Sequence, residues 1–167
     1  PAVTSLAQKI NLEYGVHKVV EKTHRLPQIN TSSRDMFVQS LNGCINYLYQ
    51  SIEPEYQIPN ELIIAQAVIE TGWGTSRFAL EGNALFGQWT FSGEGIKPKG
   101  ADVGDTHKVM KFKVLQASVR AYQRNLNTHS SYREFRKMRA IQRDNLGSLN
   151  SLELVNLLDK YAETGIE

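Results

Sequence analysis

The most constraining feature of the sequence is residues 62–69, where seven of eight side chains are apolar. Asn60 precedes this run as a candidate N-cap and Gly72 follows it, so we expect a helix over residues 61–71. A helix that is apolar on nearly every side has to be covered by other elements. The run is too short to span a bilayer, which takes about 20 apolar residues, and we expect no integral membrane segment. The chain therefore folds as a domain built around this helix.

Helical spacing of apolar residues recurs on both sides of this run. The further helices that it predicts lie at 34–52, 76–82, 114–127, 131–142 and 151–161. Between residues 85 and 112, glycines and Pro98 interrupt the pattern, and residues 88–91 and 109–112 alternate as strands do. We therefore predict a mainly α (α+β) fold, with a small antiparallel sheet or hairpin that carries a long basic loop.

The 167 residues fall within the size range of one domain, and 41% of them are apolar, as is usual for folded proteins. We expect residues 1–34 to form a loosely defined N-terminal arm and residues 35–167 to form the domain. The single cysteine, Cys44, excludes an internal disulfide framework, and the histidines lack metal-ligand spacing, so we expect no metal. The chain begins with Pro1 rather than methionine, which suggests a processed or trimmed product.

The net charge of +2 is unevenly distributed. Residues 51–96 carry one base against six acids, whereas residues 97–143 carry twelve bases against three acids. An anionic or zwitterionic polymer lying between the two segments suits this pattern, and a solvated surface with patchy charge is the alternative. Because no helix-turn-helix or zinc module accompanies the bases, we expect no nucleic-acid partner.

Glu70 is the first candidate for chemistry, because it ends the apolar helix and precedes Thr71-Gly72-Trp73-Gly74. Burial beside apolar side chains raises the pKa of a carboxyl, and a carboxyl that stays protonated can donate its proton to a leaving oxygen. Trp73 offers a flat apolar face of the kind on which sugar rings stack. The alternative is a solvated carboxylate at a helix end.

A second candidate stretch runs from Gly82 to Trp89, Gly-Asn-Ala-Leu-Phe-Gly-Gln-Trp. Asn83 can bond a ligand or its own turn, and Phe86 and Trp89 add apolar surface. Taken alone, Asn83 is more typical of a turn and Phe86 of a core.

Residues 62–91, which contain both stretches, resemble the glucosaminidase domain of glycoside hydrolase family 73 type, and more closely its bacterial Bax branch. Further stretches similar to that branch lie at 111–112, 118–122, 125–129 and 161–163. The resemblance covers about residues 35–167 and implies a lysozyme-like helical domain with a small β lobe.

The resemblance also implies hydrolysis of a β-1,4 glycosidic bond next to N-acetylglucosamine, in peptidoglycan. Glu70 falls on the general acid of the family, and Tyr161 falls on a tyrosine that faces the cleft and assists catalysis. The residues expected to contact the substrate are Trp73, Asn83, Phe86 and Trp89.

Glycoside hydrolysis usually uses a second carboxylate, which the family supplies from the β lobe. Glu94, between two glycines, is the first choice, and Asp102 and Asp105 are the alternatives. All three match the family pattern poorly, so assistance by the acetamido group of the substrate stays open.

The expected function is thus a glycan hydrolase of the endo-β-N-acetylglucosaminidase type that needs no cofactor. We expect a monomer, and the resemblance places it in the periplasm or outside the cell. A non-catalytic glycan-binding or cell-wall assembly module on the same fold is the alternative. A protein-interaction domain that uses the basic residues is a third hypothesis.

Overall fold

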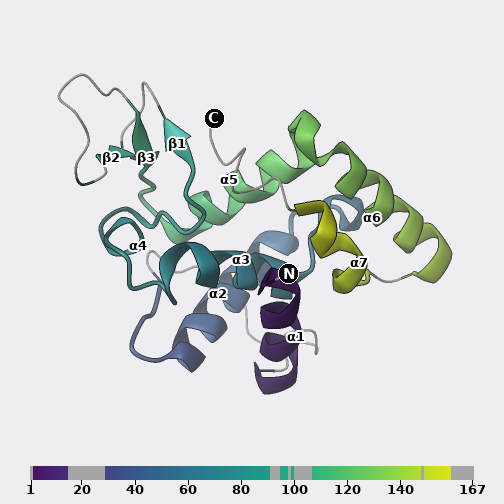
Figure 1. Cartoon of the computed structure of the whole chain (residues 1–167), viewed down its shortest axis with the longest axis horizontal. Helices are drawn as coiled ribbons and strands as arrows, with labels where there is room; N and C mark the ends of the chain where they lie inside the picture. Colours follow the sequence, from purple (N-terminus) through teal and green to yellow (C-terminus); the bar gives the residue numbers. More distant parts are fainter. Residues whose placement is uncertain are drawn as a thin grey trace.

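The computed structural model describes residues 2–14, 29–90, 95–97, 99, 107–147 and 149–158. This part of the chain is mainly helical with one small antiparallel sheet, as the sequence predicts (Figure 1). The α-helices are α1 (Ala2–Tyr14), α2 (Arg34–Tyr49), α3 (Asn60–Thr71), α4 (Arg77–Gly82), α5 (Leu115–Thr128), α6 (Arg133–Leu146) and α7 (Ser151–Val155). The 3-10 turns are η1 (Pro54–Tyr56), η2 (Ser130–Tyr132) and η3 (Asn156–Leu158), and the strands are β1 (Trp89–Thr90), β2 (Gly95–Ile96) and β3 (Lys108–Met110).

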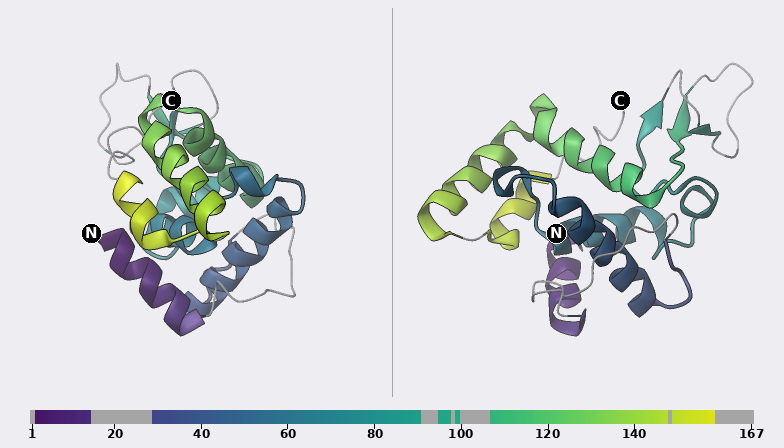
Figure 2. Two further views of the ribbon diagram at one scale, coloured as in Figure 1. Left: turned by 90° about the vertical axis from the view of Figure 1, so that its right-hand side faces the viewer. Right: turned by 180° about the vertical axis from the view of Figure 1, so that it is seen from behind.

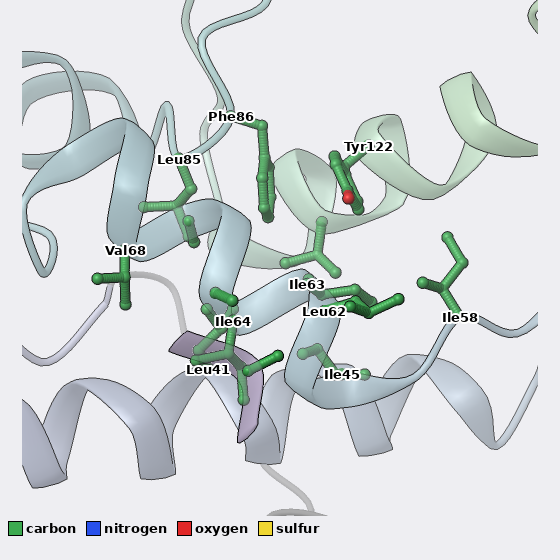
Figure 3. Close-up of a cluster of buried hydrophobic side chains, with 14 of the residues drawn as sticks. Leu41, Ile45, Ile58, Leu62, Ile63, Ile64, Val68, Leu85, Phe86 and Tyr122 are labelled. Atoms are coloured by element: carbon green, nitrogen blue, oxygen red, sulfur yellow. The ribbon is translucent and has the colours of Figure 1, made fainter. Parts of the chain in front are cut away.

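Helix α3 lies at the centre of the helical part, as its apolar sequence requires. Helices α1, α2 and α7 all pack against it. Leu41 and Ile45 of α2 lie on one side of α3, and Phe86 and Tyr122 lie on the other (Figure 3). No helix among the described residues is both long and apolar enough to cross a membrane.

Helix α1 belongs to the same core, although we expected residues 1–34 to form a loosely defined arm. Ala7 and Ile10 are buried in the cluster that surrounds α3. Residues 2–14 therefore contribute to the packing of the domain, and the domain boundary near residue 34 stays a prediction.

The start of α3 differs from the sequence prediction. Asn60 is the first helical residue rather than the N-cap, a position that Pro59 occupies without a side-chain hydrogen bond. The Asn60 amide instead donates to the side-chain oxygens of Asn42 and Asn46 on α2, at 2.7 and 2.9 Å. These hydrogen bonds hold α3 against α2. The Asn60 side chain therefore bonds residues that are distant in sequence instead of capping its own helix.

The sheet is antiparallel, with the strand order β1-β3-β2. Val109 of β3 pairs with Trp89 on one side and with Ile96 on the other. Strand β2 was not predicted, because a two-residue strand that begins with glycine shows no alternation. The sheet lies at one end of the molecule beside the start of α5, and α6 lies at the other end (Figures 1 and 2).

Contacts between α4 and the sheet fix their separation. A Cβ on Gly82 would lie 2.9 Å from Cδ1 of Ile96 and 3.1 Å from Cγ of Lys111, so a side chain here requires these two side chains to shift. The Gly82 carbonyl also accepts a hydrogen bond from the Phe112 amide at 2.8 Å. The α4 helix thereby joins the helical part to the β lobe.

Candidate functional site

The turn that follows Glu70 is fixed by several contacts. Gly72 ends α3 in the left-handed conformation (φ 57°, ψ 54°), which glycine adopts without steric cost. The Thr71 hydroxyl donates to a carbonyl of the preceding helical turn at 2.7 Å and accepts from the Gly74 amide at 2.8 Å. A Cβ on Gly74 would lie 2.8 Å from the Phe37 ring. The end of α3, and with it the backbone of Glu70, is therefore held in one place.

Each oxygen of the Glu70 carboxyl has an identified neighbour. Gln66, one turn earlier on α3, donates from Nε2 to Oε1 at 3.3 Å. The other oxygen, Oε2, lies against Gly87, where a Cβ would be only 2.9 Å away from it. Gly87 has a φ of +66°, a conformation that favours glycine. The carboxyl is thus placed between a side chain of α3 and the loop over residues 83–88.

Partial burial raises the pKa of Glu70 above its ordinary value, and the hydrogen bond from Gln66 acts in the opposite direction. Loss of water around a carboxyl disfavours its charged form, which is why burial has this sign. The residue as a whole stays exposed, so its side chain is open to a ligand from solution. The Glu70 carboxyl can therefore act as a proton donor to a ligand that arrives from solution.

Phe86 anchors the loop that carries Gly87. Its ring is only 1% exposed and stacks on Tyr122 of α5, with centroids 4.3 Å apart and ring planes 24° apart (Figure 3). Burial raises the pKa of Tyr122 well above its usual value, and neighbouring ionisable groups that include Glu70 add to the rise. Phe86 occupies the core, and its expected contact with a substrate stays a prediction.

Asn83 serves the fold through both its backbone and its amide. It caps α4 in the left-handed conformation (φ 51°), and its Nδ2 donates to the Phe112 carbonyl at 3.1 Å. The residue is 6% exposed. This is the turn role that the sequence left open beside a ligand role, and the ligand role stays a prediction.

The Trp73 ring is half-buried, and it contacts Phe37 and Arg34. It meets Phe37 edge-on at 6.0 Å between centroids, and the Arg34 guanidinium lies 4.7 Å from the ring centroid, over the ring. Stacking of a sugar on Trp73 stays a prediction, and it requires ring surface that Arg34 does not cover.

Several predicted site residues lie outside the described residues. They are Glu94, Asp102, Asp105 and Tyr161. Trp89 is described only through its backbone, as part of β1. The expected placement of these residues around Glu70 stays a prediction. Within the described ranges, no group of three or more His, Cys, Asp or Glu side chains could hold a metal ion.

Two of the basic residues of segment 97–143 serve the fold. Arg136 donates to two backbone carbonyls at the end of α5, each at 2.8 Å. Arg139 is 4% exposed and donates to the carbonyls of Tyr56 and Gln57 at 3.3 and 3.4 Å. The exposed basic residues of the segment are Lys97, Lys99, Lys111, Lys113, Arg120, Arg124, Arg133 and Lys137.

Sequence reasoning missed Gln66 and Gly87 as neighbours of Glu70. A spacing of four residues on one helix places Gln66 on the same face as Glu70, so this contact was open to prediction. Gly87 comes from another part of the chain, and no local pattern indicates which residue it approaches.

Comparison with known proteins gives a consistent result. The family model Glucosaminidase, described as mannosyl-glycoprotein endo-beta-N-acetylglucosaminidase, matches residues 46–163. The chain is similar to Protein bax of Escherichia coli (strain K12), with 34% identity over 108 residues, which are 65% of this chain and 38% of that protein. It is also similar to Exo-glucosaminidase LytG of Bacillus subtilis (strain 168), with 30% identity over 90 residues, which are 53% of this chain and 29% of that protein.

No solved structure matches the chain at a significant level. The family match spans α3, the turn after Glu70, the loop over residues 83–88 and the sheet, and so includes Gln66, Glu70 and Gly87. This extent, together with the two relatives, shows that the chain belongs to the glucosaminidase family.

Proposed function

We propose that the chain is a glycoside hydrolase that cleaves the β-1,4 bond next to N-acetylglucosamine in peptidoglycan, with Glu70 as the general acid. The observation that carries this proposal is the Glu70 carboxyl itself, which has a raised pKa and belongs to an exposed residue at the end of a buried helix. The family description supports glycosidase chemistry, and the name of LytG supports a glucosaminidase activity. The matched parts are 38% and 29% of the two relatives, so the activity of those whole proteins is only a guide.

In the proposed reaction, the bond between the anomeric carbon and the bridging oxygen breaks while Glu70 gives its proton to that oxygen. Positive charge develops on the sugar ring, and a second carboxylate stabilises it or takes a proton from the attacking water. We assign this second role to Glu94, with Asp102, Asp105 or the acetamido group of the substrate as alternatives. Tyr161 orients the substrate or stabilises the intermediate.

The glycan is proposed to lie along the surface that carries Glu70, and exposed lysines and arginines face the carboxylates of its peptide stems. The residues that we assign to the cleft are Trp73, Asn83, Phe86 and Trp89. The reaction uses no metal or organic cofactor. Because the substrate lies outside the inner membrane, we place the protein in the periplasm or outside the cell, as a monomer without a nucleic-acid partner.

Mass spectrometry of muropeptides after incubation with purified peptidoglycan tests this proposal. New reducing ends at N-acetylglucosamine support it, whereas ends at N-acetylmuramic acid or anhydro-sugars reassign the bond that is cut. Binding of wall fragments without any product supports the alternative, a non-catalytic glycan-binding or assembly module.

The variant that tests the role of Glu70 is Glu70→Gln. It keeps the size of the side chain and an oxygen that accepts a hydrogen bond, but it removes the acidic proton. We expect a loss of cleavage on the order of a hundredfold or more, with the fold intact. Glu134→Gln, an exposed change on α6 beside Lys137, is the control and keeps the wild-type rate. An unchanged rate in Glu70→Gln rejects the assignment.

A further inference from the structure

Gly87 is the backbone position that approaches Oε2 of Glu70. We propose that Gly87 is a positioning residue for Glu70: because it lacks a side chain, the loop backbone lies against Oε2 and sets the direction in which the carboxyl points. The catalytic consequence rests on the function proposed above, whereas the contact itself does not.

The steric argument comes from the space around Gly87. A Cβ at this position would lie 2.9 Å from Oε2 and 3.7 Å from Cδ of Glu70. The first distance is shorter than an ordinary van der Waals contact, so a methyl group requires either the loop or the carboxyl to move. The φ of +66° adds backbone strain for any other residue.

The loop is the less movable of the two partners. Before Gly87, the Leu85 amide donates to the Ser118 hydroxyl at 3.4 Å, and Phe86 stacks on α5. After it, the Gln88 carbonyl accepts from the Met110 amide of β3 at 2.8 Å. The Glu70 carboxyl has rotatable bonds, and within the described residues its hydrogen bond comes from Gln66 at 3.3 Å. A methyl group at position 87 is therefore expected to displace the carboxyl.

Displacement has two consequences for a general acid. A carboxyl that turns away from the loop regains water, which lowers its pKa. The displaced carboxyl also no longer points toward the oxygen that it protonates. A misplacement of about 1 Å costs on the order of a hundredfold in rate. We therefore expect Gly87→Ala to lower kcat by about that factor while KM changes much less.

The kinetic experiment measures kcat for peptidoglycan cleavage against pH in the wild type and in Gly87→Ala. A general acid works only while protonated, so activity falls as pH rises through its pKa, and a lower pKa moves this alkaline limb to lower pH. Gly147→Ala is the matched control, because Gly147 has a φ of +67° but nothing within 4 Å of its Cβ position. We expect the control to keep the wild-type kcat and alkaline limb. If Gly87→Ala also keeps the wild-type kcat and the wild-type alkaline limb, the proposal is overturned.

A stability cycle tests the contact without any need for activity. Urea unfolding is measured for the wild type, Gly87→Ala, Glu70→Ala and the double variant. The backbone strain at a φ of +66° is the same in both backgrounds, so any difference between them comes from the contact with the carboxyl. We expect the change in stability caused by Gly87→Ala to differ once Glu70 is alanine, and an equal change in both backgrounds overturns the proposal.

The cycle also covers the case in which Gly87→Ala does not fold. If Gly147→Ala, which carries a similar backbone strain, folds while Gly87→Ala does not, the double variant must recover a folded chain, and its failure to do so overturns the proposal as well. A chain that shows the coupling but cleaves no glycan keeps the contact and rejects the proposed function, so the two failures are distinguishable.

Discussion

Glu70 combines two properties that oppose each other at the scale of a single residue. Its carboxyl is partly desolvated, which raises its pKa, yet the residue stays exposed. A charged carboxylate in this place is less stable than one in water, so the folded state carries a local cost near neutral pH. Such shifted carboxyls are frequent at functional sites.

This cost predicts that Glu70→Gln is more stable than the wild type at neutral pH. The folded-state pKa is raised, so the folded chain binds the proton more tightly than the unfolded chain does. The destabilisation is absent below the unfolded pKa of about 4.3 and appears as pH rises through the folded pKa. A glutamine amide stays neutral throughout and still accepts a hydrogen bond from Gln66.

Urea unfolding between pH 4 and pH 8 measures this effect. The gain of Glu70→Gln over the wild type grows as pH rises through the pKa of Glu70 in the folded chain. A Glu70→Gln variant whose stability difference is the same at every pH contradicts the account.

At the scale of elements, the loop over residues 83–88 leads from α4 to strand β1 and packs against α5, beside Glu70. Phe86 anchors it on Tyr122, and Asn83 anchors its start on the Phe112 carbonyl. Both side chains thereby determine where Gly87 lies. Their importance for the site follows from the fold, whichever ligand the site takes.

Phe86→Ala is expected to cost about 3–5 kcal/mol of stability, because it removes a fully buried ring from the core. Glycan cleavage falls with it, since the loop loses its anchor beside Glu70. Phe78→Ala is the control: Phe78 lies on α4 and is only half-buried, so the cost is smaller. Urea unfolding of both variants at pH 7 makes the comparison, and equal costs contradict the proposed anchor.

Much of the element order could be predicted from the sequence, because apolar periodicity marks the buried face of each helix. The predicted helix 34–52 corresponds to α2, and the predicted strands at 88–91 and 109–112 correspond to β1 and β3. Strand β2 and the role of Asn60 could not be predicted, since each depends on partners that lie far away in the sequence.

In the candidate site too, local sequence patterns predict some features, whereas others depend on residues that are distant in sequence. Glu70 was identifiable because a carboxyl at the end of an apolar helix is unusual, and Gln66 follows from helical spacing. The contact with Gly87 depends on how the loop is anchored to α5 and β3, which no local pattern reveals.

At the scale of the whole molecule, the described residues form one core around α3. Helix α1 contributes to it through Ala7 and Ile10, so the beginning of the chain supports the helix that ends at the site. Arg139 adds a polar tie between α6 and the carbonyls of Tyr56 and Gln57. The position of Glu70 therefore depends on packing from both halves of the sequence.

Paired variants on α1 test this contribution. Ile10→Ala removes a side chain that is 0% exposed and is expected to cost about 2–5 kcal/mol. Leu12→Ala, on the same helix but 86% exposed, is expected to change stability by less than about 0.5 kcal/mol. Urea unfolding separates the two, and a small effect of Ile10→Ala contradicts the inclusion of α1 in the core.

The central claim is that Glu70 donates the proton, and its titration tests this most directly. Carbon-13 NMR of the glutamate-labelled chain, assigned with Glu70→Gln, gives the pKa of this carboxyl in the free chain, and the alkaline limb of kcat/KM against pH gives the pKa of the catalytic acid in the same state. The account predicts that the Glu70 pKa lies above about 4.3 and moves together with the kinetic limb in Gly87→Ala. A Glu70 pKa at or below the ordinary value, or a kinetic limb that stays in place while the NMR pKa moves, contradicts it.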